Sequence, residues 1–248
     1  GWSEGRSFQI SGAGPAAPQP QSPDNGSVFN DAQPTLLWTA IDAAAGYHVQ
    51  IGYSNDFTEL AAEDSSILTP GYNPVNPLDN ALYFWRVRAR DGRARWGSWS
   101  TPFTFTIDTS APEIPVLTQP EADRVITTPF ISFSWSAESD AVSFDLQVDY
   151  SEAFTAPVIS DSMISAQTWE NTTPFSDGIY VWRVRARDAA GNVSGWSGAQ
   201  FFSIDTQGPP APELNQPPDN AEIGDSTPQL SWFAVDGAAR YEIIVDDN

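Results

Sequence analysis

The chain has 248 residues and a formal net charge of −21, with 11 basic residues against 32 acidic ones. Such a charge is repelled by nucleic acid and by anionic membrane surfaces, so neither is expected as a partner, and no apolar run approaches the roughly 20 residues that span a bilayer. The absence of cysteine excludes disulfides and thiol chemistry, while 21 prolines, 17 glycines and 12% aromatic residues are typical of an all-β protein with many turns.

The sequence repeats itself without a gap at an interval of 97 residues (182 minus 85, for two matching tryptophans). The period predicts the last strand of one repeat in residues 1–14, whole repeats in 15–111 and 112–208, and the first three strands of another in 209–248. We therefore expect the chain to be a stretch of a longer tandem array. The matching positions are Trp2, Trp99 and Trp196; Phe8, Phe105 and Phe202; Ile10, Ile107 and Ile204; Trp38, Trp135 and Trp232; Tyr47, Phe144 and Tyr241; Pro15, Pro112 and Pro209; Pro23, Pro120 and Pro217.

Within a repeat, seven short strands can be recognised in chain order. In the first whole repeat they are expected at 18–23, at 35–39, at 46–52, weakly after a turn near Phe57, at a poorly defined segment ending near Tyr72, at 83–91 and at 102–107. Alternation and the lack of a helical period predict an all-β fold of tandem seven-stranded β-sandwiches.

The most regular strand occurs twice, as Tyr-Phe-Trp-Arg-Val-Arg-Ala-Arg-Asp at 83–91 and Tyr-Val-Trp-Arg-Val-Arg-Ala-Arg-Asp at 180–188. Alternate residues of a strand face opposite sides, so the tyrosine, tryptophan, valine and alanine belong to the core and the three arginines to the other face. The spacing from Leu78 to Tyr83, and from Phe175 to Tyr180, predicts a tyrosine corner before this strand.

These residues resemble fibronectin type III domains over essentially the whole chain: Trp38 in the second strand, Tyr47 opening the third, Leu78 before Tyr83, and Ala89 in the alternating strand. The arginine-rich strand and the Ile-Asp-Thr-x-x-Pro linker are most similar to repeats of large bacterial surface and secreted proteins. The resemblance implies the fold and an extracellular or cell-surface location, but these dispersed core positions specify little about function.

The arginines form the first candidate site, because Trp96-Gly-Ser-Trp99-Ser100 resembles the Trp-Ser-x-Trp-Ser element of class I cytokine receptors, whose arginines interleave with tryptophan rings. We expect a structural cation–π stack, joined by Trp96 in the first whole repeat only, and the alternative is an anion or phosphate site. Asp145 and Asp149 are expected as further partners on the same face. The residues of the stack are Arg86, Arg88, Arg90, Trp96, Trp99, Arg183, Arg185, Arg187 and Trp196.

No catalytic set is evident. The single histidine, His48, aligns with Asp145 and Glu242 on the outward face of a strand and is expected to be an exposed surface residue. Without cysteine or a second histidine, neither a nucleophile–base pair nor a typical zinc site can be assembled, and no carboxylate pair is marked by its spacing. We therefore expect no enzymatic activity.

Calcium is the one cofactor that the sequence suggests, at the junctions between repeats. There the end of one sandwich should meet loops of the next, and oxygen ligands on a stiff junction suit Ca²⁺. Ordinary solvated turn residues are the alternative reading. The candidate ligands are Asp108, Glu138, Asp140, Asp188 and Asn192 at one junction, and Asp205 with Asp236 at the next.

Three Asn-x-Ser/Thr sequons fall in predicted turns, where a glycan could be attached in a glycosylating secretory system. They begin at Asn25, Asn171 and Asn192, a number close to what chance supplies in a chain rich in serine and threonine.

The regular period, proline-rich linkers and acidic surface favour a structural segment of an extracellular fibre, stalk or surface layer, whose partners are neighbouring repeats and neighbouring copies. The alternative is an adhesin, or a carbohydrate-binding or spacer module of a secreted protein. The two hypotheses differ in the tryptophans outside the core: three coplanar, exposed rings would favour sugar binding. The tryptophans in question are Trp96, Trp99, Trp169 and Trp196.

Overall fold

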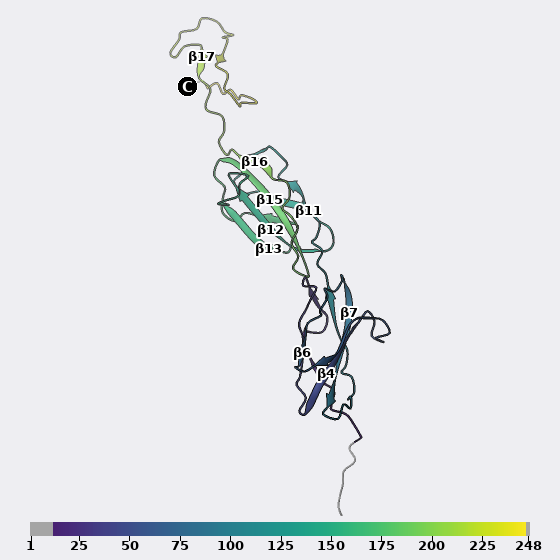
Figure 1. Ribbon diagram of the computed structural model, residues 1–248. Coiled ribbons are helices and arrows are strands. Elements are labelled where there is room, and N and C mark those ends of the chain that lie inside the picture. Colours follow the sequence, from purple (N-terminus) through teal and green to yellow (C-terminus); the bar gives the residue numbers. More distant parts are fainter. Residues whose placement is uncertain (1–11, 247–248) are drawn as a thin grey trace, which may run out of the picture.

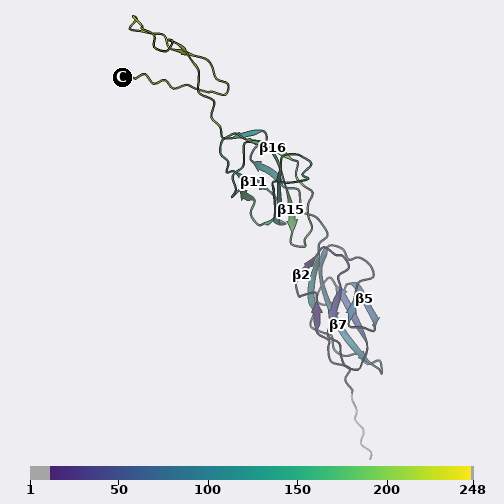
Figure 2. The same cartoon turned by 90° about the vertical axis from the view of Figure 1, so that its left-hand side faces the viewer.

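The computed structural model describes residues 12–246, and all the regular structure in this range is β-strand. Figures 1 and 2 show two sandwiches arranged end to end, followed by a smaller C-terminal part. The strand predicted in residues 1–14, with Trp2, Phe8 and Ile10, lies almost entirely outside the described residues. No helix long and apolar enough to cross a membrane occurs between residues 12 and 246.

The first sandwich packs a three-stranded sheet, in the order β1-β3-β6, against a five-stranded sheet, in the order β2-β8-β7-β4-β5. Neighbouring strands are antiparallel except β2 and β8, which run parallel. The strands are β1 (Pro20–Ser22), β2 (Ser27–Phe29), β3 (Leu36–Trp38), β4 (Ala44–Gly52), β5 (Leu60–Ile67), β6 (Gly71–Tyr72), β7 (Ala81–Asp91) and β8 (Phe103–Ile107).

The second sandwich repeats this topology, with sheets in the orders β9-β11-β14 and β10-β16-β15-β12-β13. Its long central strands have the same lengths as their counterparts in the first sandwich. The strands are β9 (Val116–Gln119), β10 (Arg124–Ile126), β11 (Ser132–Ser136), β12 (Ala141–Asp149), β13 (Ile159–Ile164), β14 (Thr168–Glu170), β15 (Gly178–Asp188) and β16 (Gln200–Ile204).

The core of each sandwich lies between its two sheets and consists of the alternating residues of the arginine-rich strand and their partners. In the first sandwich, Ile51 lies opposite Trp85, and Trp38 of the other sheet packs on the Trp85 ring at 6.4 Å. Trp85 and its counterpart Trp182 are fully buried. Burial of each large side chain stabilises the fold by about 1.5–3 kcal/mol.

The predicted tyrosine corner is present in both sandwiches. The Tyr83 hydroxyl donates to the Asp79 carbonyl, and the Tyr180 hydroxyl donates to the Ser176 carbonyl, each at 2.9 Å. Burial, the largest cause, raises the pKa of each tyrosine to about 12. Both hydroxyls therefore remain protonated donors that anchor the start of the central strand.

Two features of the sheets differ from the prediction. The strand expected to be weak near Phe57 is the regular strand β5, which begins three residues later, because Phe57 itself lies in the turn. A short strand missing from the prediction, β2, pairs in parallel with β8 at the edge of the larger sheet. Its three residues are too few for alternation to show in the sequence.

In the C-terminal part, β17 (Leu214–Gln216) and β18 (Ser231–Trp232) form an antiparallel pair, as the repeat predicts. The third strand, expected around Tyr241 to Val245, is not formed up to residue 246. In both complete sandwiches this strand pairs with the arginine-rich strand. Residues 209–246 contain no such strand, so the third strand lacks its hydrogen-bonding partner.

Candidate functional site

The arginines of β7 form a layer with tryptophans on the outer face of the first sandwich. The Arg86 guanidinium carbon lies 4.4 Å from the centre of the Trp99 ring. Arg88 lies between the two indoles, 4.3 Å from Trp99 and 4.9 Å from Trp96. Arg90 was expected to stack on Trp99. It lies 5.6 Å from the centre of the Trp96 ring and stacks on that ring instead. Each desolvated cation–π contact contributes about 0.5–2 kcal/mol.

The segment after β7 folds back along the strand and thereby brings the tryptophans over the arginines. The amide of Gly97 donates to the Ala89 carbonyl, and the amide of Ser100 donates to the Val87 carbonyl, each at 2.8 Å. The Ser100 hydroxyl in turn accepts a hydrogen bond from the Val87 amide at 3.1 Å. The second sandwich has the equivalent bond from Val184 to Ser197.

A phenylalanine at the end of the layer was missed by the sequence analysis. The Arg86 guanidinium carbon lies 3.9 Å from the centre of the Phe57 ring, and that of Arg183 lies 3.8 Å from the centre of the Phe154 ring. Both phenylalanines are buried, and both have a positive φ, of 56° and 47°, which is unusual for a bulky residue. Their separation equals the repeat period and is the signal that could have revealed them.

The layer of the second sandwich is shorter. Arg183 and Arg185 lie 4.4 and 4.6 Å from Trp196. Arg187 has no indole beside it among residues 12–246, because Val193 occupies the position of Trp96. The prediction of a stack is therefore wrong for Arg187. Its guanidinium lies 3.5 Å from the carboxylate of Asp145 instead.

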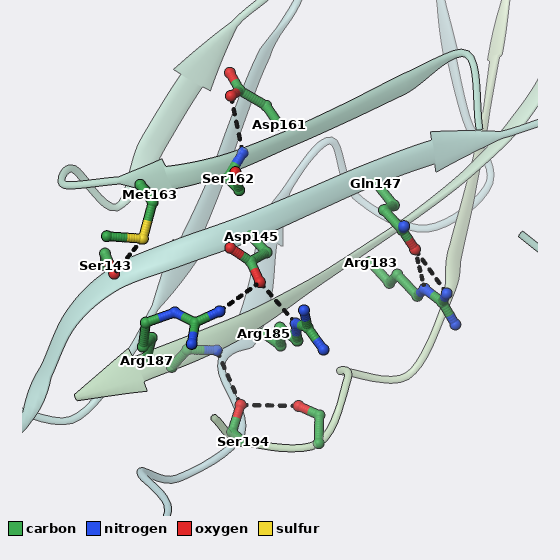
Figure 3. A network of polar contacts seen from close by, with 12 residues as sticks. Ser143, Asp145, Gln147, Asp161, Ser162, Met163, Arg183, Arg185, Arg187 and Ser194 are labelled. Atoms are coloured by element: carbon green, nitrogen blue, oxygen red, sulfur yellow. Dashed lines mark hydrogen bonds and ion pairs between the residues drawn. The ribbon is translucent and has the colours of Figure 1, made fainter. Parts of the chain in front are cut away.

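Polar side chains of the neighbouring strand complete each layer. Gln50 Oε1 accepts two hydrogen bonds from Arg86, and Gln147 Oε1 accepts two from Arg183. In the second sandwich, Oδ2 of the buried Asp145 accepts from Arg185 at 2.8 Å. Figure 3 shows this contact. Asp149, also expected as a partner, accepts from the backbone amides of the following turn, and its negative charge opposes the lowering of the Arg183 pKa by burial.

His48 replaces Asp145 in the first sandwich, and the expectation that it is exposed is wrong. It does face outward from β4, but only 7% of its surface is exposed, because the Trp96 and Trp99 rings lie 5.4 and 4.8 Å from its imidazole. Nδ1 accepts from Arg88 Nη2 at 3.0 Å, and Nε2 donates to Glu63 at 2.7 Å. This pairing defines the neutral tautomer with the proton on Nε2.

The electrostatics of the layer follow from its burial. Desolvation is the main cause that lowers the pKa of His48, aided by the positive charge of Arg88 and opposed by Glu63. Desolvation likewise lowers the pKa values of Arg86, Arg88 and Arg183, which start so high that all three stay charged. The anion-site alternative gains little from this geometry, because the guanidinium groups already contact rings, amides and carboxylates.

The four tryptophans outside the core do not form an exposed aromatic platform. Trp96, Trp99 and Trp196 are half-buried and belong to the arginine layers. Trp169 is also half-buried, on β14 at the other side of the second sandwich. Three coplanar, exposed tryptophan rings, which would have favoured sugar binding, are therefore not present among the described residues.

The junction between the sandwiches is bridged by Asn192. Its side-chain Nδ2 donates to the backbone carbonyl of Asp108 at 2.7 Å and to Asp188 at 2.8 Å. The Asn192 amide donates to the other carboxylate oxygen of Asp188, which is buried. In the linker, Pro112 and Pro115 are buried as well. The junction is thus a packed contact between consecutive sandwiches.

The calcium hypothesis gains no support from this arrangement. The Asp108 carboxylate accepts from the Ser110 amide, while Glu138 and Asp140 are exposed. At the next junction, Asp205 accepts from the Gln207 amide, and Asp236 is exposed. Among residues 12–246, no three or more histidine, aspartate or glutamate side chains are grouped as metal ligands. Calcium binding stays a prediction, tested by the melting temperature with and without a chelator.

The three sequons differ in how their side-chain amides are used. Asn171 is buried and its Nδ2 donates to the carbonyls of Pro129 and Thr173, while the Nδ2 of Asn192 is used at the junction. Asn25 is exposed, and its side-chain oxygen accepts from Thr104. Glycosylation also stays a prediction, and the geometry favours Asn25.

Comparison with known proteins gives relatives over most of the chain. The chain is 34% identical to Endoglucanase B of Cellulomonas fimi over 188 residues, which are 71% of this chain. It is 26% identical to Exoglucanase B of the same organism over 198 residues, which are 77% of this chain. The aligned part is 17% of the length of each relative. No protein-family profile matches the chain.

Two solved structures with similar architecture were also found. The fibronectin(III)-like modules of Clostridium thermocellum CbhA share 16% identity with a TM-score of 0.47, covering 75% of this chain and 92% of theirs. The FN1–FN3 domains of chicken CNTN1 share 16% identity with a TM-score of 0.48, covering 79% of this chain and 67% of theirs. Both sandwiches of this chain have a three-stranded and a five-stranded sheet in the same strand order, and both have the tyrosine corner. The chain therefore carries tandem β-sandwiches that share one strand order.

Proposed function

We propose that the chain is a non-catalytic spacer segment of an extracellular bacterial protein, in which stiff repeats form part of a longer array such as a fibre, stalk or surface layer. The observation that carries the proposal is the junction, where Asn192 donates to the Asp108 carbonyl and the linker prolines are buried. A contact of this kind restricts rotation of one sandwich against the next. Neighbouring repeats, and in a fibre neighbouring copies, are the proposed partners.

The rest of the molecule supports this role. Proline fixes φ near −65°, so Pro112 and Pro115 limit the conformations of the linker. The arginine layers stiffen the outer face of each sandwich through contacts that recur at the repeat period. A net charge of −21 keeps the surface soluble and limits non-specific association. The relatives from Cellulomonas fimi, whose names denote glucanases, are consistent with a secreted bacterial protein.

Small-angle X-ray scattering of the whole chain tests the proposal. We expect an elongated particle with one well-defined maximum dimension for the two sandwiches. The triple variant Asn192→Ala, Pro112→Gly, Pro115→Gly should give a broader distribution of shapes, whereas Asn215→Ala, the same asparagine change away from this junction, should not. A native chain as heterogeneous as the triple variant would contradict the spacer role.

A second candidate function is carbohydrate binding within a secreted protein that acts on polysaccharide, as the names of the two glucanases suggest. The observation in its favour is a groove at the edge of the second sandwich, lined by tyrosine and tryptophan beside hydroxyl groups. This function is compatible with the spacer role, because the groove lies away from the Asn192 contact.

A further inference from the structure

A cavity of about 460 Å³ opens along one edge of the second sandwich. It lies between β13 and β14, the terminal strands of the two sheets, which have no further neighbour among residues 12–246. Its volume falls within the range of about 300–1,000 Å³ that is usual for small-ligand sites. The cavity lies on the open side of the sandwich, with its core as the floor.

Aromatic rings supply the apolar part of the lining. Trp169 is half-buried and packs on Phe133 at 5.8 Å. Tyr150 is 61% exposed and lies 5.0 Å from the ring of Tyr180. Phe175 supports Tyr180 from behind at 4.8 Å. Two large rings therefore reach the surface on a base that the core holds in place.

Polar groups lie beside these rings. The Trp169 indole donates to Asp161 Oδ2 at 2.7 Å, which ties the edge strand of one sheet to that of the other. Ser160, Thr172 and Thr173 also line the cavity, and their hydroxyls form no hydrogen bond with the described residues. These three hydroxyls can each donate and accept.

The lining selects a class of ligand. No lysine or arginine contributes to it, and Asp161 adds negative charge to a chain already at −21, so an anion is disfavoured. A purely apolar ligand would bury the three free hydroxyls without partners, which is costly. A sugar ring combines an apolar face for an aromatic side chain with hydroxyls that pair with neutral polar groups.

The first sandwich lacks this combination, although the fold is the same. Tyr72 replaces Trp169 and is buried, while Pro74 and Val75 replace Asn171 and Thr172. Asp64, which replaces Asp161, accepts from Ser66 of its own strand instead of reaching across the opening. The tyrosine at the rim is kept, as Tyr53, which is 42% exposed.

From this geometry we infer that the groove between β13 and β14 is a binding site for a neutral oligosaccharide. Tyr150 and Trp169 contact the apolar faces of the sugar rings, and the hydroxyls of Ser160, Thr172 and Thr173 pair with the ligand hydroxyls. The inference rests on the second candidate function and is independent of the spacer role. The site belongs to the second sandwich alone.

Titration of the whole chain with tetrasaccharides, followed by amide chemical shifts in NMR spectra, tests the inference. Neutral tetramers of glucose or xylose should change the amide chemical shifts of residues 158–176 and leave those of the first sandwich unchanged. Concentrations up to about 10 mM are sufficient to detect a Kd of about 1 mM. Tetragalacturonate, which carries carboxylates, should bind at least about tenfold more weakly. Absence of shifts with every neutral tetramer, or stronger binding of the charged one, would overturn the inference.

Matched substitutions locate the site. Tyr150→Ala and Thr172→Val should each weaken binding about three- to tenfold, which corresponds to about 0.7–1.4 kcal/mol. Tyr53→Ala, the same change at the equivalent position of the first sandwich, should have no effect. Both tyrosines are exposed, so neither variant is expected to unfold. Equal affinities for Tyr150→Ala and the native chain would mean that the ligand does not bind in this groove. This outcome is independent of the scattering experiment, which tests the spacer role.

Discussion

The two sandwiches share strand order and core but differ beneath the tryptophans of the outer face. The first has His48 there, covered by two indoles and paired with Glu63 and Arg88. The second has Asp145, which pairs with Arg185 and Arg187 beside the single indole of Trp196. The core positions are hydrophobic in both sandwiches, whereas the outer layer reaches the same stacking with groups of different charge.

Tryptophan-to-alanine changes in the core should have the largest effect on stability, and this effect should be the same in both sandwiches. Trp85→Ala and Trp182→Ala remove fully buried rings, so each should cost about 3–5 kcal/mol in the free energy of unfolding of its own sandwich. Calorimetry of both variants checks this. A much smaller loss in one sandwich would show that the two cores are not equivalent.

Double-mutant cycles on the outer layer should bring out the difference. The coupling of Arg185 with Trp196 is expected to be about 1–2 kcal/mol, because no second indole remains when Trp196 is removed. The coupling of Arg88 with Trp99 should be smaller, about 0.5–1 kcal/mol, since Arg88 keeps its contact with Trp96. Chemical denaturation of the single and double alanine variants measures both. Equal couplings would mean that Trp96 adds nothing.

The pH dependence of stability should distinguish the sandwiches as well. Since burial lowers the pKa of His48, the folded state binds this proton more weakly than the unfolded state, whose pKa is about 6.5. The contribution of neutral His48 is therefore complete above pH 6.5 and is lost as pH falls through the lower, folded value. Arg88 and Arg86 oppose protonation, and Glu63 favours it.

Thermal unfolding between pH 7 and pH 5 measures this effect. The first sandwich should lose stability over the range, and His48→Gln, which cannot be protonated there, should remove the dependence. Glu63 has a lowered pKa, mainly because Gln50 donates to it, so its own contribution is lost only at more acidic pH, below about 4.5. An unchanged slope in His48→Gln would contradict this role of the histidine.

Loss of the junction contact should have a modest effect on stability. Asn192→Ala removes one hydrogen bond to the neighbouring sandwich and the bonds that hold Asp188, so we expect a loss of about 1–2 kcal/mol in the second sandwich only. Calorimetry should show the first sandwich unchanged. A larger loss in the first sandwich would mean that the two unfold as one unit.

Much of the fold could be predicted because the period supplies the same information twice. Trp38, Trp85 and the tyrosine corners follow from alternation and spacing alone. The strand around Tyr241 could not be predicted in the same way, because its formation depends on a partner strand that residues 209–246 do not contain. Strand β2 is too short to carry a pattern.

The outer layer was harder to predict than the core. Alternation places His48 on the outer face, but its burial depends on two rings that fold back from a distant loop. The position of Phe57 depends on a turn with positive φ, which the sequence shows only through its repetition at Phe154. The Asn192 bridge occupies a place where the acidic residues suggested calcium, because composition does not reveal which side chain reaches across a junction.

A distance measurement between equivalent positions of the two sandwiches tests the stiff junction most directly. Leu82 and Ile179 are exposed on β7 and β15, one repeat apart, and the absence of native cysteine makes Leu82→Cys/Ile179→Cys labelling specific. Double electron–electron resonance between spin labels should give one narrow distance distribution, and adding Asn192→Ala should broaden it. A broad distribution in the otherwise native chain, unchanged by Asn192→Ala, would contradict a junction held by this contact.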